Sequence, residues 1–146
     1  MNNYHFYTHT VRLFYELLEQ KDLKRWMKLW AKDAKNIFPY SSLPMPHTLE
    51  GIVNIRQFWS STPKMYARLS FLVNEIYIKP HKATVFFESH HLIRDSPKHH
   101  KDLNIGVFEF NERGKIQCYT EYFDPINLGQ TFQMLHITKM PGSTDK

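Results

Sequence analysis

The second half of the chain consists of four long segments with the composition of β-strands, and this feature restricts the possible folds more than any other. The segments run from Leu69 to Ile78, from Ala83 to Arg94, from Leu103 to Phe110 and from Lys115 to Phe123. Because the links between them are short, we expect consecutive strands to pair antiparallel. The links are expected to be polar turns or loops, and they read KPHK (79–82), DSPKHHKD (95–102) and NERG (111–114).

Helices are expected before these strands. Apolar residues recur at the spacing i, i+3, i+4, i+7 in two successive runs, which is the pattern of an amphipathic helix. Asp22 lies between the runs and is expected to cap the second helix. A third helix is expected to begin at Gly51, while Pro39, Pro44 and Pro46 predict an irregular stretch before it. The recurring apolar residues are Val11, Phe14, Tyr15, Leu18, Leu23, Trp26, Met27 and Trp30.

Helices followed by an antiparallel meander predict an α+β fold, with the helices packed on one face of the sheet. The chain has 146 residues, the size of one domain, and 42% of them are hydrophobic. We therefore expect a single packed domain over residues 1–146, with a disordered tail at residues 142–146. The 15% share of aromatic residues favours a pocket for a flat or apolar small molecule.

Charge and cysteine content bear on partners and location. The net charge is +5, but the densest basic stretch, Lys21 to Lys28, has helical spacing and is expected to be a solvated helix face, so nucleic-acid binding is not favoured. The single Cys118 excludes an internal disulfide and fits a reducing compartment. We see no signal peptide and no apolar run of membrane-spanning length, and we expect a cytoplasmic protein with no membrane partner.

Three stretches, WAKDAKNIFPY, LEGIVNIRQFW and GVFEFNERGKIQCYTEYFDPINLG, resemble a known pattern. They look like the helix end and first strand, the glycine-started third helix and the final hairpin of the NTF2-like superfamily, which includes ketosteroid isomerases, SnoaL-like polyketide cyclases and phenazine-biosynthesis A/B proteins. The resemblance covers about residues 8 to 130 and implies a cone of helices packed on a strongly curved antiparallel sheet. It is greatest to the phenazine A/B branch, whose Glu-aromatic-x-Asn-Pro motif reads EYFDP here (121–125).

The sequence also departs from that branch. ARLSFLVNEIY lacks the pocket histidine that the phenazine A/B proteins have there, and TPKMYARL lacks their acidic segment. The Tyr-plus-Asp pair of the ketosteroid isomerases has no recognisable counterpart. The substrate of the phenazine branch is therefore not carried over, and a non-catalytic module that binds a ligand or a partner protein remains an alternative.

Glu121 is the leading candidate for catalysis. Because strand residues alternate faces, Tyr119, Glu121 and Phe123 share one side, which the resemblance places in the concave pocket. A carboxylate buried between two aromatic rings would have a raised pKa, so that it could both accept and donate a proton near neutral pH. The alternative is that Glu121 pairs with Arg113 or Lys115, or faces solvent.

Other residues could assist Glu121. His90 and His91 point to opposite faces of one strand, and the sequence does not fix which of them faces the pocket. Tyr40 lies where the resemblance puts the pocket rim and could donate its hydroxyl to a carbonyl oxygen, although a core role is equally open. The residues expected to bind substrate are Tyr119, Phe123, Phe38, Trp59 and Phe87.

No cofactor and no metal is expected. Adjacent histidines on a strand, such as His90 and His91, cannot bind one ion together, and His99-His100 has no cysteine or acid at ligand spacing. The sequence also lacks a Gly-rich phosphate loop and a nucleophile elbow. We therefore predict a cofactor-free enzyme that isomerises, cyclises or condenses an apolar or aromatic carbonyl compound, and that forms a homodimer through the outer sheet face.

Overall fold

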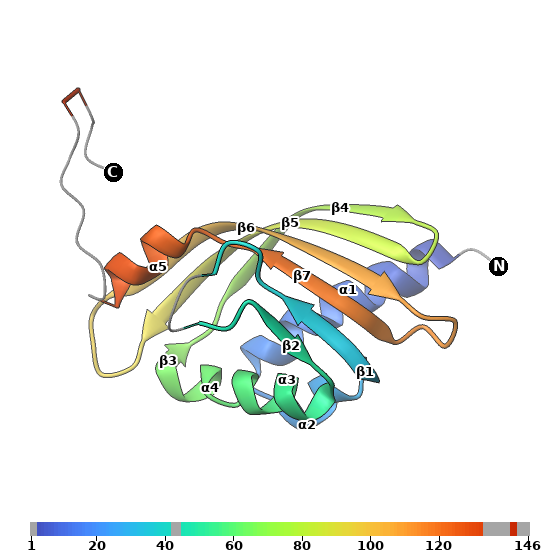
Figure 1. Ribbon diagram of the computed structural model, residues 1–146. Helices are drawn as coiled ribbons and strands as arrows, with labels where there is room; N and C mark the ends of the chain where they lie inside the picture. Colours follow the sequence, from blue (N-terminus) through green and yellow to red (C-terminus); the bar gives the residue numbers. More distant parts are fainter. Residues whose placement is uncertain (1–2, 42–44, 133–140, 143–146) are drawn as a thin grey trace.

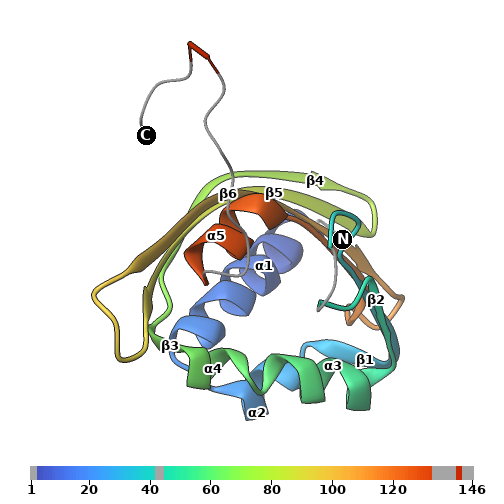
Figure 2. The ribbon, with the colours of Figure 1, turned by 60° about the vertical axis from the view of Figure 1, so that its left-hand side comes forward.

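One curved sheet arches over helix α1, and shorter helices lie across the open side of the arch (Figures 1 and 2). The computed structural model describes residues 3–41, 45–132 and 141–142. The elements are α1 (Asn3–Glu19), α2 (Leu23–Met27), β1 (Trp30–Ile37), β2 (Thr48–Glu50), α3 (Ile52–Trp59), α4 (Thr62–Met65), β3 (Tyr66–Arg68), β4 (Phe71–Lys79), β5 (Lys82–Ile93), β6 (His99–Phe110), β7 (Ile116–Tyr122) and α5 (Pro125–Thr131).

The sheet has seven strands in the order β2-β1-β7-β6-β5-β3, and β4 also pairs with β5. Strands β4 to β7 form an antiparallel meander, as the short links predicted. The pair β1–β7 is parallel, because β1 reaches the sheet from α2 and not through a hairpin. The predicted α+β class, with N-terminal helices against a curved and mainly antiparallel sheet, is confirmed.

Two segments differ from the prediction. The stretch from Trp30 to Ile37 is strand β1: the local pattern predicts a helix at Trp30 and irregular chain in the following residues, whereas the resemblance implies a first strand here. Its backbone pairs with β7 and its Ala34 and Asn36 side chains are buried. Strand β6 begins at His99, inside the segment predicted to be a loop. Its polar residues continue the ladder with β5, since backbone pairing does not require apolar side chains. Of the tail predicted to be disordered, residues 143–146 lie outside the described part of the chain.

The core is an aromatic cluster between α1 and the inner face of the sheet. Phe14 packs edge-on against Phe108, with ring centroids 4.9 Å apart, and lies 4.8 Å from the ring of Tyr119. Tyr15, the next residue on α1, lies 4.6 Å from Phe87. Aromatic pairs at these distances add to the stability that burial alone gives. The helix face predicted from the spacing of apolar residues is therefore the face that fills the arch.

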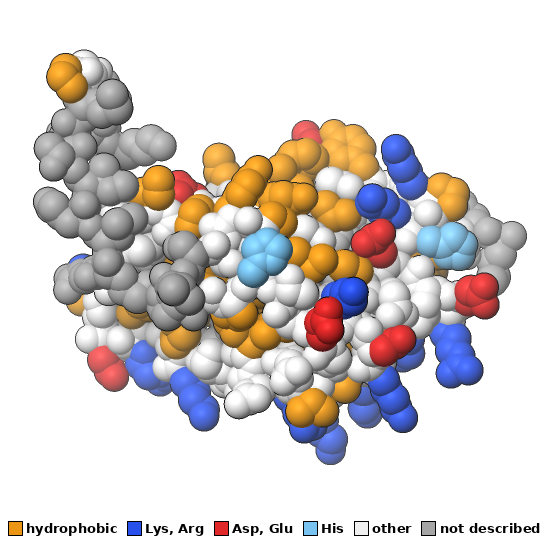
Figure 3. Space-filling model, viewed as in Figure 1, with side chains coloured by type: hydrophobic (Ala, Val, Ile, Leu, Met, Phe, Trp, Pro, Cys, Tyr) orange, Lys and Arg blue, Asp and Glu red, His pale blue; other side chains and the backbone are white. Residues whose placement is uncertain are grey.

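The outer face of the sheet is open in this chain and partly apolar (Figure 3). Large apolar side chains on it remain exposed, namely Leu72, Tyr77, Phe86 and Leu103. Inward residues of β5 such as Val85 and Phe87 are, in contrast, almost completely buried. In the described part of the chain, no helix has both the length and the apolar character needed to span a bilayer.

Asn36 joins three elements in the interior. Its side chain is fully buried, its Oδ1 accepts a hydrogen bond from Trp59 Nε1 on α3 (2.7 Å), and its Nδ2 donates to the carbonyl of Tyr119 on β7 (3.0 Å). A buried polar side chain is stabilising only when it is paired, and here both ends of the amide are. Asn36 therefore fixes α3 and β7 relative to β1.

We predict that Asn36→Ala lowers the free energy of unfolding by about 2–4 kcal/mol, because the indole N–H and the carbonyl lose their partner in the interior. Urea denaturation measures this change. Asn54→Ala is the matched control, because Asn54 lies on α3 and its side chain also donates to a backbone carbonyl, at the surface. Equal losses for the two variants would contradict the role given to Asn36.

Candidate functional site

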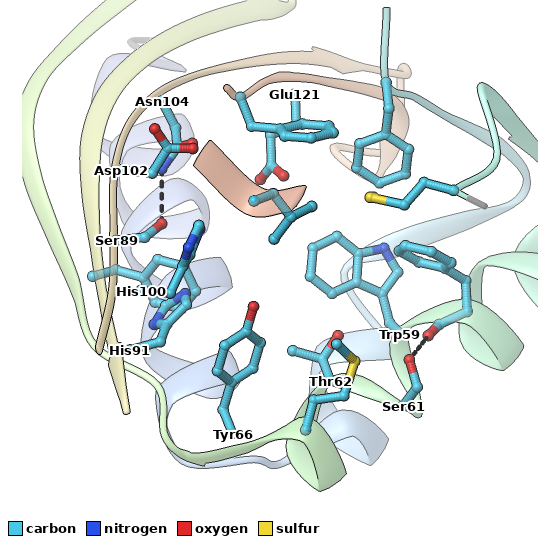
Figure 4. A pocket seen from close by; sticks show the side chains of 17 residues that line it. Trp59, Ser61, Thr62, Tyr66, Ser89, His91, His100, Asp102, Asn104 and Glu121 are labelled. Atoms are coloured by element: carbon cyan, nitrogen blue, oxygen red, sulfur yellow. Dashed lines mark hydrogen bonds between the residues drawn. The ribbon is translucent and has the colours of Figure 1, made fainter. Parts of the chain in front are cut away.

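A cavity of about 200 Å³ lies between the inner face of the sheet and helices α3, α4 and α5 (Figure 4). Its apolar lining is Phe38, Met45, Phe58, Trp59, Met65, Phe71, Phe123 and Leu128. Its polar lining is Ser61, Thr62, Tyr66, Ser89, His91, His100, Asp102, Asn104 and Glu121. A cavity of about 150 Å³ accommodates benzene, so this one is large enough for a compound of one or two rings.

The carboxyl group of Glu121 points from β7 into this cavity (Figure 4). The hydroxyl of Tyr119 donates a hydrogen bond to Glu121 Oε1 at 2.8 Å. Tyr15 lies 3.2 Å, oxygen to oxygen, from the same hydroxyl. Since the proton of Tyr119 is directed to the carboxylate, Tyr15 donates to Tyr119, and a chain of two hydrogen bonds leads from α1 to Glu121.

Burial raises the pKa of Glu121 to about 7, and the negative charge of Asp102 contributes in the same direction. The hydrogen bond from Tyr119 favours the ionised form and opposes this rise. Burial also raises the pKa of Tyr119 well above its usual value, so the tyrosine keeps its proton. Glu121 can therefore both accept and release a proton near neutral pH, while Tyr119 remains a donor.

Gly106 leaves the space that this hydrogen-bond chain occupies. It lies opposite Glu121 in the β6–β7 ladder. A Cβ atom at Gly106 would lie 2.6 Å from the hydroxyl oxygen of Tyr15 and 3.0 Å from that of Tyr119. Both tyrosines are packed in the core and cannot swing away. The glycine is thus required by a close approach of side chains to the strand.

Two histidines face each other across the β5–β6 ladder. His91 pairs directly with His100, and both side chains are buried. His91 Nδ1 accepts a hydrogen bond from the backbone N–H of Ser70 at 3.1 Å. A neutral imidazole with an accepting Nδ1 carries its hydrogen on Nε2. Burial, followed by the charges of His100 and His90, lowers the pKa of His91 to about 3, so this ring is neutral at physiological pH.

His100 has the opposite tautomer. Its Nδ1 lies 3.2 Å from Thr131 Oγ1, whose own proton is donated to the carbonyl of Asn127 at 2.8 Å. Nδ1 of His100 is therefore the donor to Thr131, and the lone pair is on Nε2. Burial lowers the pKa of His100, and the nearby charges of Asp102 and Asp124 partly offset this. The cavity thus contains one histidine with an Nε2–H group and one with a free Nε2 lone pair.

Asp102 adds a second carboxyl group to the cavity. It accepts hydrogen bonds from the backbone N–H groups of Leu103 (3.0 Å) and Asp124 (3.1 Å). Burial raises its pKa, and these N–H groups counter the rise. Because Asp102 is tied to the backbone at the start of α5, its oxygens are less available to a ligand than those of Glu121. No group of three or more His, Cys, Asp or Glu residues within 3–41, 45–132 and 141–142 is arranged to hold a metal ion.

The structure separates the candidate catalytic residues. Glu121 and His91 line the cavity, whereas His90 is on the outer face, where its Nε2 lies 3.1 Å from Glu88 Oε1. Tyr40 does not reach the cavity: it is 60% exposed, and its ring packs against Tyr122 on the outer face. Phe38, directly after β1, takes the inward position instead and is 1% exposed.

The ion pair considered for Glu121 does not form. Lys115 Nζ instead donates to the backbone carbonyl of Lys28, and the salt bridges of the described residues do not include Glu121. Among the residues expected to bind substrate, Phe38, Trp59 and Phe123 line the cavity. Tyr119 and Phe87 do not line the cavity. Tyr119 hydrogen-bonds to Glu121 from the core, and Phe87 is buried in the core against Tyr15.

Sequence reasoning missed seven polar residues of the cavity, which are Ser61, Thr62, Tyr66, Ser89, His100, Asp102 and Asn104. A signal existed for three of them. His100, Asp102 and Asn104 continue the alternation of Phe108 and Gly106 backwards along β6, so extending that strand through its polar start would have placed them inside. Tyr66 follows a Pro-containing helical turn and carries no such pattern.

Comparison with known proteins identifies the family. The family model of the SnoaL-like domain matches residues 11–119. The uncharacterized protein YesE of Bacillus subtilis (strain 168) is 28% identical over 135 residues, which cover 90% of each chain. A Bacillus subtilis protein provisionally named an isomerase has a crystal structure with a TM-score of 0.83 and 25% identity, covering 94% of this chain and all (100%) of that one.

A phenazine biosynthesis-related protein from Pseudomonas aeruginosa has the same fold, with a TM-score of 0.75 at 14% identity, over 94% of this chain and 87% of its own. The predicted resemblance to NTF2-like, SnoaL-like and phenazine A/B proteins is thus confirmed at the level of fold. Since the family model covers most of the sequence, the chain belongs to the SnoaL-like domain family.

Proposed function

We propose that this protein is a cofactor-free enzyme that isomerises, cyclises or condenses an apolar or aromatic carbonyl compound, with Glu121 as general acid and base. One observation carries the proposal: a carboxyl group with a pKa of about 7 points into a largely apolar cavity and is held there by Tyr119. A perturbed carboxyl group in a cavity is a frequent mark of a catalytic site.

All three reactions begin with a proton transfer, and isomerisation requires nothing more. The carboxylate of Glu121 takes a proton from the carbon next to the substrate carbonyl, and the electron pair of the broken C–H bond moves into an enolate. In an isomerisation the same proton, now on Glu121, is then returned to another carbon. In a cyclisation or condensation the enolate carbon attacks a second carbonyl carbon, of the same molecule or of a second substrate molecule; the C–C bond forms as the C–O π bond of that carbonyl breaks, and the resulting alkoxide takes the proton from Glu121. No oxidant or reductant is consumed. A pKa close to the working pH suits a group that must act in both directions.

The pKa values of His91, His100 and Tyr119 indicate a different role for these groups than for Glu121. His91 and His100 have lowered pKa values and are neutral near pH 7, so neither is a cation that would hold Glu121 in its ionised form. Tyr119 keeps its proton and serves to orient the carboxylate. When the pKa values of neighbouring groups are pushed apart in this way, each has a distinct task.

Family membership supports the same reading. The chain belongs to the SnoaL-like family, and a relative of similar fold with 25% identity is provisionally named an isomerase. The phenazine-related neighbour, at 14% identity, supports the fold alone. Substrate identity is not transferred from either protein.

A non-catalytic binding module is the second candidate. The observation in its favour is that neither histidine hydrogen-bonds to Glu121, whose carboxylate, among the described residues, accepts only from Tyr119. Under the enzymatic proposal the proton moves between Glu121 and the substrate, so no direct contact with a histidine is needed. Measuring proton transfer therefore separates the two candidates.

We also propose that the protein is a homodimer through the outer face of the sheet. Leu103 is 75% exposed there, and Leu72, Tyr77 and Phe86 are exposed on the same face. An exposed group of large apolar side chains is usually covered by a partner. The cavity opens on the opposite side of the sheet, so this contact would leave the site accessible.

The first test uses 2-tetralone, a two-ring ketone whose benzylic C–H lies next to the carbonyl. We predict that the protein accelerates deuterium uptake at this carbon in D2O, and that Glu121→Gln reduces the acceleration by about 100-fold or more. Mass spectrometry measures the uptake. Glu112→Gln, in the exposed 111–114 turn, is the control and should exchange like the wild type. Wild-type exchange no faster than in buffer would favour the binding module.

A second prediction concerns pH. The exchange rate should rise with pH, with a midpoint near 7, because only the ionised form of Glu121 accepts a proton. Tyr119→Phe removes a hydrogen bond that favours the ionised form, so the midpoint should move to higher pH. Tyr77→Phe, which removes a hydroxyl on the outer face, should leave it unchanged. A midpoint that moves downward in Tyr119→Phe would refute the assignment.

The third prediction is that the raised pKa of Glu121 lowers the stability of the folded protein at neutral and higher pH. The pKa of Glu121 is raised in the folded state from 4.5 to about 7. The folded protein thus holds this proton more tightly than the unfolded chain, and the resulting stability is full below pH 4.5 and is lost as the pH rises to about 7. Glu121→Gln has no charge to bury and should be more stable than wild type by about 3 kcal/mol above pH 7. Urea denaturation at about pH 5 and about pH 8 tests this, and an equal difference at both would contradict it.

A further inference from the structure

The hydroxyl of Tyr66 is a polar group in the cavity that the proposed acid-base chemistry does not use. Tyr66 is 7% exposed, and its hydroxyl points into the cavity toward the carboxyl group of Glu121 (Figure 4). It makes no hydrogen bond within the described part of the chain, although its ring packs 4.9 Å from that of His91. A cavity-facing hydroxyl that has no partner within the protein is free to donate to a ligand that supplies an acceptor.

Two cations hold the short segment that carries Tyr66. Lys21 Nζ donates to the backbone carbonyls of Pro63 (3.1 Å), Tyr66 (2.8 Å) and Ala67 (3.2 Å). Lys21 itself adopts a left-handed backbone with φ of 59°, an unfavourable conformation for a residue with a side chain. Hydrogen bonds from an ammonium group are stronger than neutral ones, so this segment is firmly tied to the α1–α2 turn.

Arg94 holds the same segment from the other side. Its Nε donates to the carbonyl of Lys64 at 2.9 Å, and its guanidinium also reaches the carbonyl of Pro63 at 3.1 Å. Its backbone N–H donates to the carbonyl of Met65 at 3.0 Å. The turn before β3 is therefore fixed through its carbonyl groups by Lys21 on one side and Arg94 on the other. This fixes where the ring of Tyr66 enters the cavity.

His91 supplies a second donor beside Tyr66. Its Nδ1 is engaged by the backbone N–H of Ser70, which leaves the hydrogen on Nε2. That Nε2–H has no acceptor among the residues that the structure describes. Both groups are neutral donors near pH 7. Burial raises the pKa of Tyr66, so its hydroxyl keeps its proton, and burial lowers the pKa of His91, so its ring is uncharged and keeps a single N–H. The wall of the cavity across from Glu121 thus contains two neutral donors without acceptors.

We propose that the Tyr66 hydroxyl and the His91 Nε2–H bind the carbonyl oxygen of the substrate, with Lys21 and Arg94 as positioning residues. The inference rests on the proposed function and names what that site selects: a ketone whose oxygen lies against Tyr66 and His91 while an adjacent C–H faces Glu121. As that C–H bond breaks, negative charge develops on the oxygen, and two fixed donors stabilise it more than they stabilise the ketone.

Equilibrium binding of 2-tetralone tests the proposal, because proton exchange returns the same compound and leaves the measured affinity unaffected. The comparison compound is 2-methylenetetralin, which has the same shape but carries a C=CH2 group in place of the carbonyl. Both are titrated at a pH well above 7, where Glu121 is ionised and cannot donate a hydrogen bond. We expect the ketone to bind more tightly than the hydrocarbon, and its carbonyl stretching frequency, measured by infrared difference spectroscopy, to fall on binding.

Tyr66→Phe keeps the ring and removes only the donor. It should weaken ketone binding about threefold to tenfold and leave hydrocarbon binding unchanged. The carbonyl stretching frequency of the bound ketone should move part of the way back toward its value in solution. Tyr77→Phe on the outer face is the matched control. Lys21→Met should broaden the carbonyl band and reduce its shift, because the donor is less firmly positioned. Lys24→Met, which replaces an exposed lysine of α2, should change neither. Either the Tyr66 or the Lys21 variant is sufficient to test the proposal if the other does not fold.

The outcomes distinguish this inference from the function on which it rests. A carbonyl shift that depends on Tyr66 but is accompanied by no deuterium exchange would support the inference and refute the acid-base role of Glu121. Exchange that depends on Glu121, with an infrared shift unaffected by Tyr66→Phe, would overturn the inference alone. Equal affinity for the ketone and the hydrocarbon, or no binding of either, would also overturn it.

Discussion

The packing of α1 into the curve of the sheet is the constraint on which the rest of the molecule depends. Phe14 and its aromatic neighbours fill the space between helix and sheet, and the cavity is the part of the arch that they leave open. Tyr15 belongs to both regions, because its ring packs in the core and its hydroxyl begins the chain of hydrogen bonds to Glu121. The position of the carboxyl group is therefore set by the hydrophobic core itself, which is rigid because it is close-packed.

The site divides into two sides with different chemistry. Glu121 supplies a proton acceptor from β7, while Tyr66 and His91 supply neutral donors from β3 and β5. The donors are held by contacts that lie outside the cavity, at Lys21, Arg94 and Ser70. Burial against the largely apolar lining raises the pKa of the carboxyl group. Under the proposed function, this division provides what an acid-base catalyst for carbonyl compounds requires.

The fold was largely predictable from the sequence, and the site only in part. The strong apolar alternation of β5 and β7 and the helical spacing in α1 identified those elements, and alternation alone placed Tyr119, Glu121 and Phe123 on one face. The start of β6 was not identified, because the polar residues that line a cavity hide the usual strand signal. His100 and Asp102 were lost with it. A local pattern could not choose between His90 and His91 either, since that depends on register with β6.

The contact between Gly106 and the two tyrosine hydroxyls links three positions that are far apart in the sequence. A methyl group at residue 106 would lie 2.6 Å from the hydroxyl oxygen of Tyr15 and 2.9 Å from the ring carbon Cε1 of Tyr119, so the loss of the two hydroxyls alone would not make room for it. Residues 15, 106 and 119 should therefore vary together among related proteins: alanine at 106 requires the loss of the hydroxyl at 15 and a side chain smaller than phenylalanine at 119. Such a relative would lose the support of its carboxyl group, so the identity of a single small residue would report whether the hydrogen-bond chain to that group is intact.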